Sequence, residues 1–193
     1  MGSPASDLNN RYTYREYREW DDTDRWELID GHAYNMTPAP SRVHQEICGE
    51  LFRQFANFLT DKACRVYSAP FDVRLPEGNE ADDDIVTVVQ PDLSVVCDRS
   101  RLDDKGCKGS PDLIVEVVSP STAQKDLKEK LLLYEKSGVR EYWIVDPAAK
   151  TVMVFHRNET KVFGRPDIYT EEDRIRVGIF PELTVELNSV FRD

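Results

Sequence analysis

The chain has 193 residues, of which 40% are hydrophobic and 10% aromatic, enough apolar material to close the core of one domain. Its net charge of −11 argues against a protein that coats nucleic acid, because contacts to phosphate need clustered lysine and arginine. No apolar run reaches the roughly 18 residues of a membrane span, and no secretory signal is recognisable. We therefore expect a cytoplasmic protein with no membrane partner, made of a disordered tail (1–10) and a single domain (11–193).

The first part of the chain carries local signals for helices and a hairpin. A capping box at residues 13–16 predicts a short helix. The stretch WELIDGHAYNM, residues 26–36, predicts two strands joined by a type I′ turn at the Asp-Gly pair 30–31. Ser41 is the expected N-cap of a helix that extends to about residue 60. The apolar stripe of that helix has helical spacing and consists of Val43, Ile47, Leu51, Phe55 and Phe58.

The second part of the chain alternates strands with one helix. Strands are predicted at 64–75, at 86–98 with a break or start at Pro91, and at 112–118, whose continuous apolar run indicates cover on both faces. A helix is expected over 122–137, followed by further short strands. The order helix, strand, strand, strand, helix, strand predicts an α/β fold, α+β by some counts. Its mixed sheet is flanked by helices and has extra strands at both ends of the chain.

The four cysteines, Cys48, Cys64, Cys97 and Cys107, share no CxxC spacing, and the three histidines lie far apart in the sequence. Closely spaced cysteine and histidine ligands are the usual sequence signature of a zinc site, so none is predicted. Because nothing points to secretion, the cysteines are expected to be reduced thiols.

One acid stands in the middle of the most apolar strand. If the strands after Pro91 and at 112–118 are antiparallel neighbours, their register places Asp92 opposite Glu116. Asp112 lies some 13 Å from Glu116 along the same strand, too far to share an ion with it. Two carboxylates so close repel each other unless one is protonated or a divalent cation lies between them. Oxygen ligands suit Mg²⁺ or Mn²⁺. The alternative is that Asp92 only begins a strand and Glu116 pairs with a buried lysine or arginine.

Two further side chains are candidates for the same site. On a helical wheel of 122–137, Lys130 falls inside the edge of the apolar stripe, and Asp126, one turn earlier, can orient its ammonium group. Lys130 then either extends to solvent beside Asp126 or reaches Glu116. On the earlier helix His44 lies near the centre of the apolar stripe. It is either a histidine packed in the core or a ligand of the site.

At these residues the chain resembles the Uma2 (DUF820) family of the PD-(D/E)xK nuclease superfamily. The matching stretches are ELIDG, MTPAPSRVHQEI, APFDVRL, QPDLSVVCD, GSPDLIVEVVSPSTAQKDLKEKLLLYEKSGVREYWIVDP and FPEL. The resemblance implies a restriction-endonuclease-like core in which Asp92 and Glu116 hold Mg²⁺ and a lysine two residues after the second acid assists. That position is Val118 here. Lys130, supported by Asp126, is the expected replacement, with Lys125 as the second choice.

The resemblance implies a divalent-metal-dependent endonuclease that hydrolyses DNA phosphodiester bonds, as a homodimer by analogy with enzymes that cut both strands. The displaced lysine and the acidic charge leave an alternative open. In that alternative the chain is a catalytically weak nuclease-fold module that binds nucleic acid or a protein partner.

Overall fold

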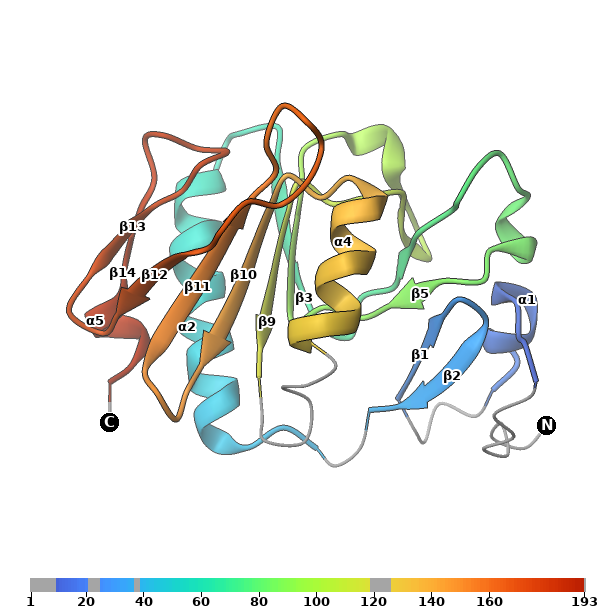
Figure 1. Ribbon diagram of the computed structural model, residues 1–193, viewed down its shortest axis with the longest axis horizontal. Coiled ribbons are helices and arrows are strands. Elements are labelled where there is room, and N and C mark those ends of the chain that lie inside the picture. Colours follow the sequence, from blue (N-terminus) through green and yellow to red (C-terminus); the bar gives the residue numbers. More distant parts are fainter. Residues whose placement is uncertain (1–9, 21–24, 37–38, 119–125, 193) are drawn as a thin grey trace.

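The computed structural model describes residues 10–20, 25–36, 39–118 and 126–192 of the chain. Its described strands form two six-stranded sheets and one two-stranded sheet (Figure 1). We call the central one the core sheet, with the order β12 (Asp167–Thr170), β11 (Thr151–His156), β10 (Glu141–Asp146), β9 (Leu113–Val117), β6 (Leu93–Val96) and β3 (Arg65–Ser68). Only β9 and β10 pair in parallel, so the sheet is mixed, as the sequence predicts.

The core sheet is covered by one helix on each face. Figure 1 shows α4 (Leu131–Ser137) in front of the sheet and α2 (Arg42–Leu59) behind it. The odd-numbered residues of β9 pack on the α2 side and Ile114 on the α4 side, because side chains alternate along a strand. Every residue of β9 is therefore buried, which confirms the prediction made from its continuous apolar run.

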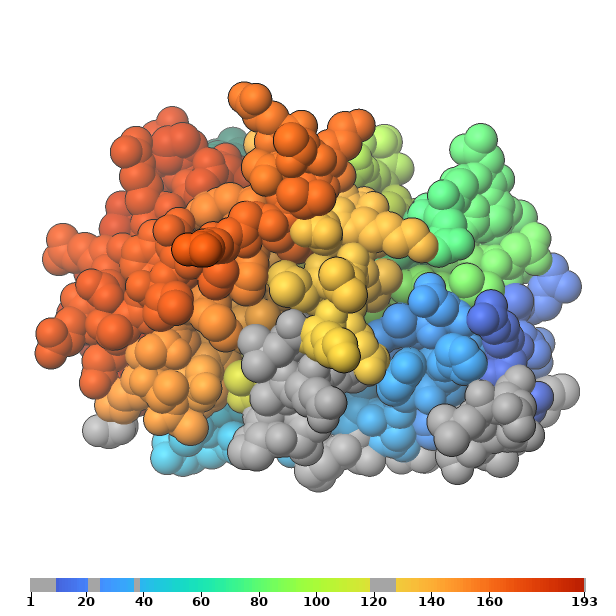
Figure 2. Space-filling view, in the orientation of Figure 1, coloured from blue at the N-terminus to red at the C-terminus, as the bar shows by residue number. Residues whose placement is uncertain are grey.

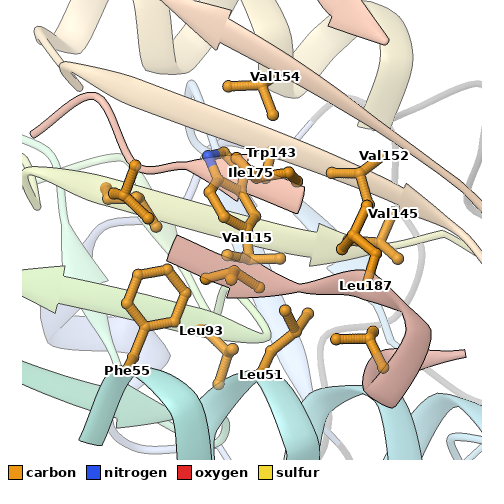
Figure 3. Close-up of a cluster of buried hydrophobic side chains, with 14 of the residues drawn as sticks. Leu51, Phe55, Leu93, Val115, Trp143, Val145, Val152, Val154, Ile175 and Leu187 are labelled. Atoms are coloured by element: carbon orange, nitrogen blue, oxygen red, sulfur yellow. The ribbon is translucent and has the colours of Figure 1, made fainter. Parts of the chain in front are cut away.

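Packing between α2 and the core sheet builds the larger hydrophobic core. In Figure 3, Leu51 and Phe55 of α2 point toward Leu93, Val115 and Trp143 of the sheet, and the rings of Phe55 and Trp143 lie 5.6 Å apart. The short α5 (Leu187–Val190), with β13 (Arg174–Arg176) and β14 (Thr184–Glu186), closes this core near the carboxyl end. Residues 184–191, expected as a strand, contain the strand β14 followed by the helix α5.

The helix α2 begins where the sequence predicts. The Ser41 side chain accepts a hydrogen bond from the His44 amide (3.2 Å), which caps the first turn. Most of the predicted apolar stripe is buried or partly buried, but Val43 is 42% exposed and does not join the core. It lies in the first turn, where His44 takes the position that faces the sheet.

The second six-stranded sheet lies beside the core sheet, and we call it the N-terminal sheet. Its order is β2 (His32–Asn35), β1 (Trp26–Ile29), β5 (Val88–Val89), β4 (Val73–Arg74), β8 (Gly106–Lys108) and β7 (Leu102–Asp103). Asp30 and Gly31 both have positive φ, 49° and 80°, which confirms the predicted turn between β1 and β2. The short α1 (Tyr14–Tyr17) has the predicted capping box. The one-turn segments η1 (Asp82–Asp84) and η2 (Arg99–Arg101) complete this part of the chain.

Two predicted strands each divide between the sheets. The segment 64–75, expected as one strand, is β3 in the core sheet and β4 in the N-terminal sheet. The segment 86–98 contributes β5 and β6, and the expected break at Pro91 is confirmed. A hydrophobic pattern persists through both segments because each half is buried in its own sheet, so the pattern alone does not show the division.

The expectation of four reduced cysteines is wrong for two of them. Cys64 and Cys97 form a disulfide, with their Cα atoms 3.9 Å apart. The two residues continue the antiparallel register of β3 and β6 by one step beyond the pair Arg65 and Val96, which brings their sulfur atoms together. The bond follows from strand pairing, about which the spacing of cysteines in the sequence says nothing.

The described part of the helix expected over 122–137 consists of a π-helical turn, η3 (Asp126–Lys130), and α4. The predicted end at Gly138 is confirmed, since that residue has the left-handed φ of 95° found at helix C-termini. Among the described helices, none is both long and apolar enough to cross a membrane.

Candidate active site

Asp92 and Glu116 are the two acids that the sequence singles out, and the strand register agrees with the prediction. β6 and β9 pair through Leu93 with Val115, and this register, continued by one residue beyond β6, sets Asp92 opposite Glu116. The amide of Val117, the next residue after Glu116, donates a hydrogen bond to Asp92 Oδ2 (2.8 Å). The Asp92 carboxylate is therefore fixed against the end of β9.

Glu116 lies on the face of the core sheet that α4 covers, and it is 4% exposed. Its Oε1 accepts hydrogen bonds from Lys130 Nζ (2.8 Å) and from the Tyr134 hydroxyl (2.8 Å). Lys130 and Tyr134 are four residues apart, so consecutive helical turns present both donors to the same oxygen. Burial, followed by the negative charge of Glu116, raises the pKa of Tyr134 well above its usual value, so the phenol remains a hydrogen-bond donor.

Lys130 faces inward, as its wheel position predicts, and only 3% of its side chain is exposed. Its ammonium nitrogen also lies 2.9 Å from Oε1 of Glu27, a residue of β1 in the N-terminal sheet. Glu27 accepts a further hydrogen bond from the Gln90 amide (3.0 Å), two residues before Asp92. In Figure 2 the yellow surface of η3 and α4 borders the blue surface of the β1–β2 hairpin, where these elements meet.

Sequence reasoning did not assign Glu27 to the site. The signal was nevertheless available, because Glu27 stands between Trp26 and Leu28 in a strand, just as Glu116 stands between two valines. A buried acid in a strand needs a partner, and here the two acids share the cation of Lys130.

His44 approaches Asp92 from the other side of the core sheet. Its Nε2 lies 3.1 Å from Asp92 Oδ2, and its Nδ1 lies 3.6 Å from the Sγ atom of Cys48, one turn further along α2. Both side chains of the His44–Asp92 pair are 15% exposed, so this part of the site opens to solvent. Burial, followed by the charges of Asp92 and Glu116, raises the pKa of Cys48, so the thiol is held in its protonated form.

Two acids and two helices thus meet at the end of the β6–β9 pair. α2 contacts Asp92 through His44, whereas η3 and α4 contact Glu116 through Lys130 and Tyr134 from the opposite face of the sheet. The other oxygen of Asp92, Oδ1, accepts no hydrogen bond from any described residue. A carboxylate oxygen in this position fits a hard divalent cation such as Mg²⁺.

The other residues considered in the sequence analysis lie away from the two acids, in the core or outside the described residues. Asp112 lies away from the site, where it accepts a hydrogen bond from the Cys97 amide (2.8 Å) and pairs with Arg140 (3.2 Å). Val118, at the position of the motif lysine, packs in the core on the α4 side. Lys125 and the side chain of Asp126 lie outside the described residues, so the support expected from Asp126 is not tested.

Comparison with known proteins identifies the family and the fold of the chain. A family model described as "Putative restriction endonuclease", Uma2, matches residues 14–188. A protein of Synechocystis sp., "Uncharacterized protein slr1290", is 27% identical over 147 residues, which cover 75% of this chain and 73% of that protein. A crystal structure from Anabaena variabilis, described as "a putative nuclease belonging to DUF820", shares the fold. It has a TM-score of 0.73 and 20% identity over 93% of this chain and 97% of the other. Since the family model spans most of the sequence, the chain belongs to the Uma2 family.

Proposed function

We propose that the chain is a divalent-metal-dependent endonuclease of restriction type that hydrolyses DNA phosphodiester bonds. The observation that carries this proposal is the contact of Lys130 Nζ with Glu116 (2.8 Å), next to the register that sets Asp92 opposite Glu116. In this proposal Lys130 takes the role left open by Val118. Family membership supports the same reaction class.

In this proposal Asp92 and Glu116 hold Mg²⁺, with Mn²⁺ as a substitute. The ion, when bound, supplies an activated water and neutralises charge on the phosphate. Lys130 positions Glu116 and provides positive charge near the scissile group, while Tyr134 holds the same carboxylate oxygen. His44 orients Asp92 through the 3.1 Å contact. Asp126 keeps the supporting role given by its place one turn before Lys130.

The overall charge of −11 fits a protein that meets DNA weakly or with the help of a partner, because its own surface attracts phosphate poorly. A bound cation would lower this repulsion locally. We also propose that the protein acts in the cytoplasm. We further propose that it acts as a homodimer, since cutting both strands of a duplex calls for two sites related by a two-fold axis.

One observation favours the second candidate, a catalytically weak nuclease-fold module that binds nucleic acid or a protein partner. Glu116 is almost fully buried and already receives Lys130 and Tyr134, whereas His44 contacts Asp92 from the opposite face. In such a module Lys130 would replace the metal ion as the counter-charge of the two buried glutamates.

A cleavage assay separates the two candidates. Plasmid and oligonucleotide DNA are incubated with the protein and Mg²⁺ or Mn²⁺, using wild type, Asp92→Asn, Glu116→Gln and Lys130→Ala. Glu46→Gln is the matched control, because Glu46 lies on the exposed side of α2 and pairs only with Arg42 among the described residues. We expect cleavage by wild type and by the control, and a loss of at least 100-fold in the three site variants. Absence of cleavage with either metal, or equal cleavage by wild type and Glu116→Gln, contradicts the nuclease proposal.

A further inference from the structure

The imidazole of His44 lies between a thiol and a carboxylate. His44, Cys48 and Asp92 each offer one ligand atom, and these three atoms lie within 4.8 Å of one another. In the described part of the chain, this is the group of three histidine, cysteine and acidic side chains that is close enough to hold a metal ion. In a tetrahedral zinc site the ligand atoms are about 3.3–3.8 Å apart, given bond lengths of about 2.0–2.3 Å. The limit of 4.8 Å exceeds that range by about 1 Å. Because His44 Nε2 faces Asp92 and Nδ1 faces Cys48, the imidazole must also turn so that one nitrogen faces an ion shared with both partners.

The backbone already holds these ligands in place. His44 and Cys48 are four residues apart on α2, so both project from the same face of the helix. The Ser41 cap fixes the first turn, and Ile47 and Leu51 anchor the helix in the core. Two ligands at this spacing on one helix are a common arrangement in zinc proteins.

The third ligand is held by a different element. Asp92 directly precedes β6, and the Val117 amide donates a hydrogen bond to one of its carboxylate oxygens. With both His44 and Asp92 15% exposed, solvent can supply a fourth ligand. Three protein ligands and one open position are the coordination found in catalytic zinc sites.

The donor types decide which ion the group prefers. Mg²⁺ takes oxygen ligands, whereas an imidazole and a thiolate favour Zn²⁺ and Co²⁺. We propose that His44, Cys48 and Asp92 form a binding site for a zinc-class divalent ion. On binding, the Cys48 S–H bond breaks, sulfur forms a bond to the ion, and the proton leaves to solvent. No electron is transferred, so no further reactant is needed.

The shared ligand gives the site a consequence for activity. If Asp92 also holds Mg²⁺, as the proposed function requires, the two ions compete for it and zinc inhibits cleavage. This competition rests on the proposed nuclease activity. Binding of the zinc-class ion does not, because it depends only on the three ligands.

The test uses the purified full-length protein without DNA or reducing agent, titrated with Co²⁺ and then with Zn²⁺. A thiolate bound to Co²⁺ gives a charge-transfer absorption band in the near ultraviolet, and displacement of Co²⁺ by Zn²⁺ removes it. We expect one ion per chain in wild type. We expect no such band in Cys48→Ala, and at least 10-fold weaker binding in His44→Gln. Cys107→Ala is the matched control, because Cys107 is the other free thiol of the described chain and is fully buried elsewhere.

Circular dichroism of each variant shows whether it is folded, and the His44→Gln variant keeps the test valid if Cys48→Ala is not. A wild-type protein that gives no thiolate band, or a band that persists in Cys48→Ala, overturns the proposal. Cleavage with Mg²⁺ is then measured with and without Zn²⁺. A protein that binds Co²⁺ through Cys48 but never cleaves DNA would refute the proposed function and leave the metal site intact.

Discussion

Replacing Lys130 by methionine tests how far the buried cation stabilises the fold. Its ammonium nitrogen lies 2.9 Å from Glu27 and 2.8 Å from Glu116, and the three side chains are at most 5% exposed. At an effective dielectric constant of about 20, each contact supplies about 6 kcal/mol of Coulomb attraction. Most of this offsets the cost of burying the charges. Without the cation two carboxylates remain buried, so we expect the free energy of unfolding to fall by about 3–5 kcal/mol.

Urea denaturation followed by circular dichroism measures this loss. Arg42→Met is the matched control, because the Arg42–Glu46 pair is 75% and 50% exposed and should contribute no more than about 0.5 kcal/mol. Adding Glu27→Gln and Glu116→Gln to the Lys130 variant should recover most of the loss, because no buried charge is then left alone. A loss for Lys130→Met as small as that of the control would refute the reasoning.

Three further predictions concern stability. Burial raises the pKa of Tyr14 to about 12, so the stability it contributes is complete below pH 10 and is lost as the pH rises to 12. In urea denaturation at each pH, the loss over this range should be about 2–3 kcal/mol smaller in Tyr14→Phe than in wild type, because Tyr134 and Tyr17 still titrate in the variant, and an equal loss would contradict the prediction. Gly106→Ala places a Cβ 2.2 Å from the Asp72 carbonyl oxygen at a φ of +124° and should cost more than about 1 kcal/mol. Gly49→Ala, in open space on α2, should gain about 0.5–1 kcal/mol, and equal shifts in thermal denaturation would argue against this account. Reducing the disulfide at the end of the β3–β6 pair, which links residues 33 apart, should lower the free energy of unfolding by about 3–4 kcal/mol. An unchanged denaturation midpoint with reductant would count against it.

The parts of the site that the sequence predicts are those set by local rules. Two antiparallel strands pair symmetrically about the middle of the loop that joins them, and this symmetry is enough to predict Asp92 opposite Glu116. Helical periodicity is enough to predict that Lys130 faces inward. The same rules place His44 on the inner side of α2. Each of these inferences needs only the period of one element or the pairing of two neighbouring strands.

The parts that it misses depend on contacts between distant segments. Glu27 reaches Lys130 because β1 of the N-terminal sheet lies beside η3, and no periodicity in either segment contains that information. Cys48 joins His44 and Asp92 for the same reason, since one ligand comes from a strand far along the chain. Rules on ligand spacing within a segment, which led to the prediction of no zinc site, do not apply to such a group.

The contact between Glu27 and Lys130 also bears on how the molecule assembles. The two residues are about 100 positions apart, so closing that contact costs chain entropy that only the finished packing repays. The hairpin of β1 and β2 cannot therefore be regarded as an appendage to a self-sufficient nuclease core. A fragment that starts after it would lack Glu27, one of the carboxylates that Lys130 contacts in the described structure. The candidate site is in this sense completed by the first of the described strands, and its buried ion pairs form only once both sheets have folded against each other.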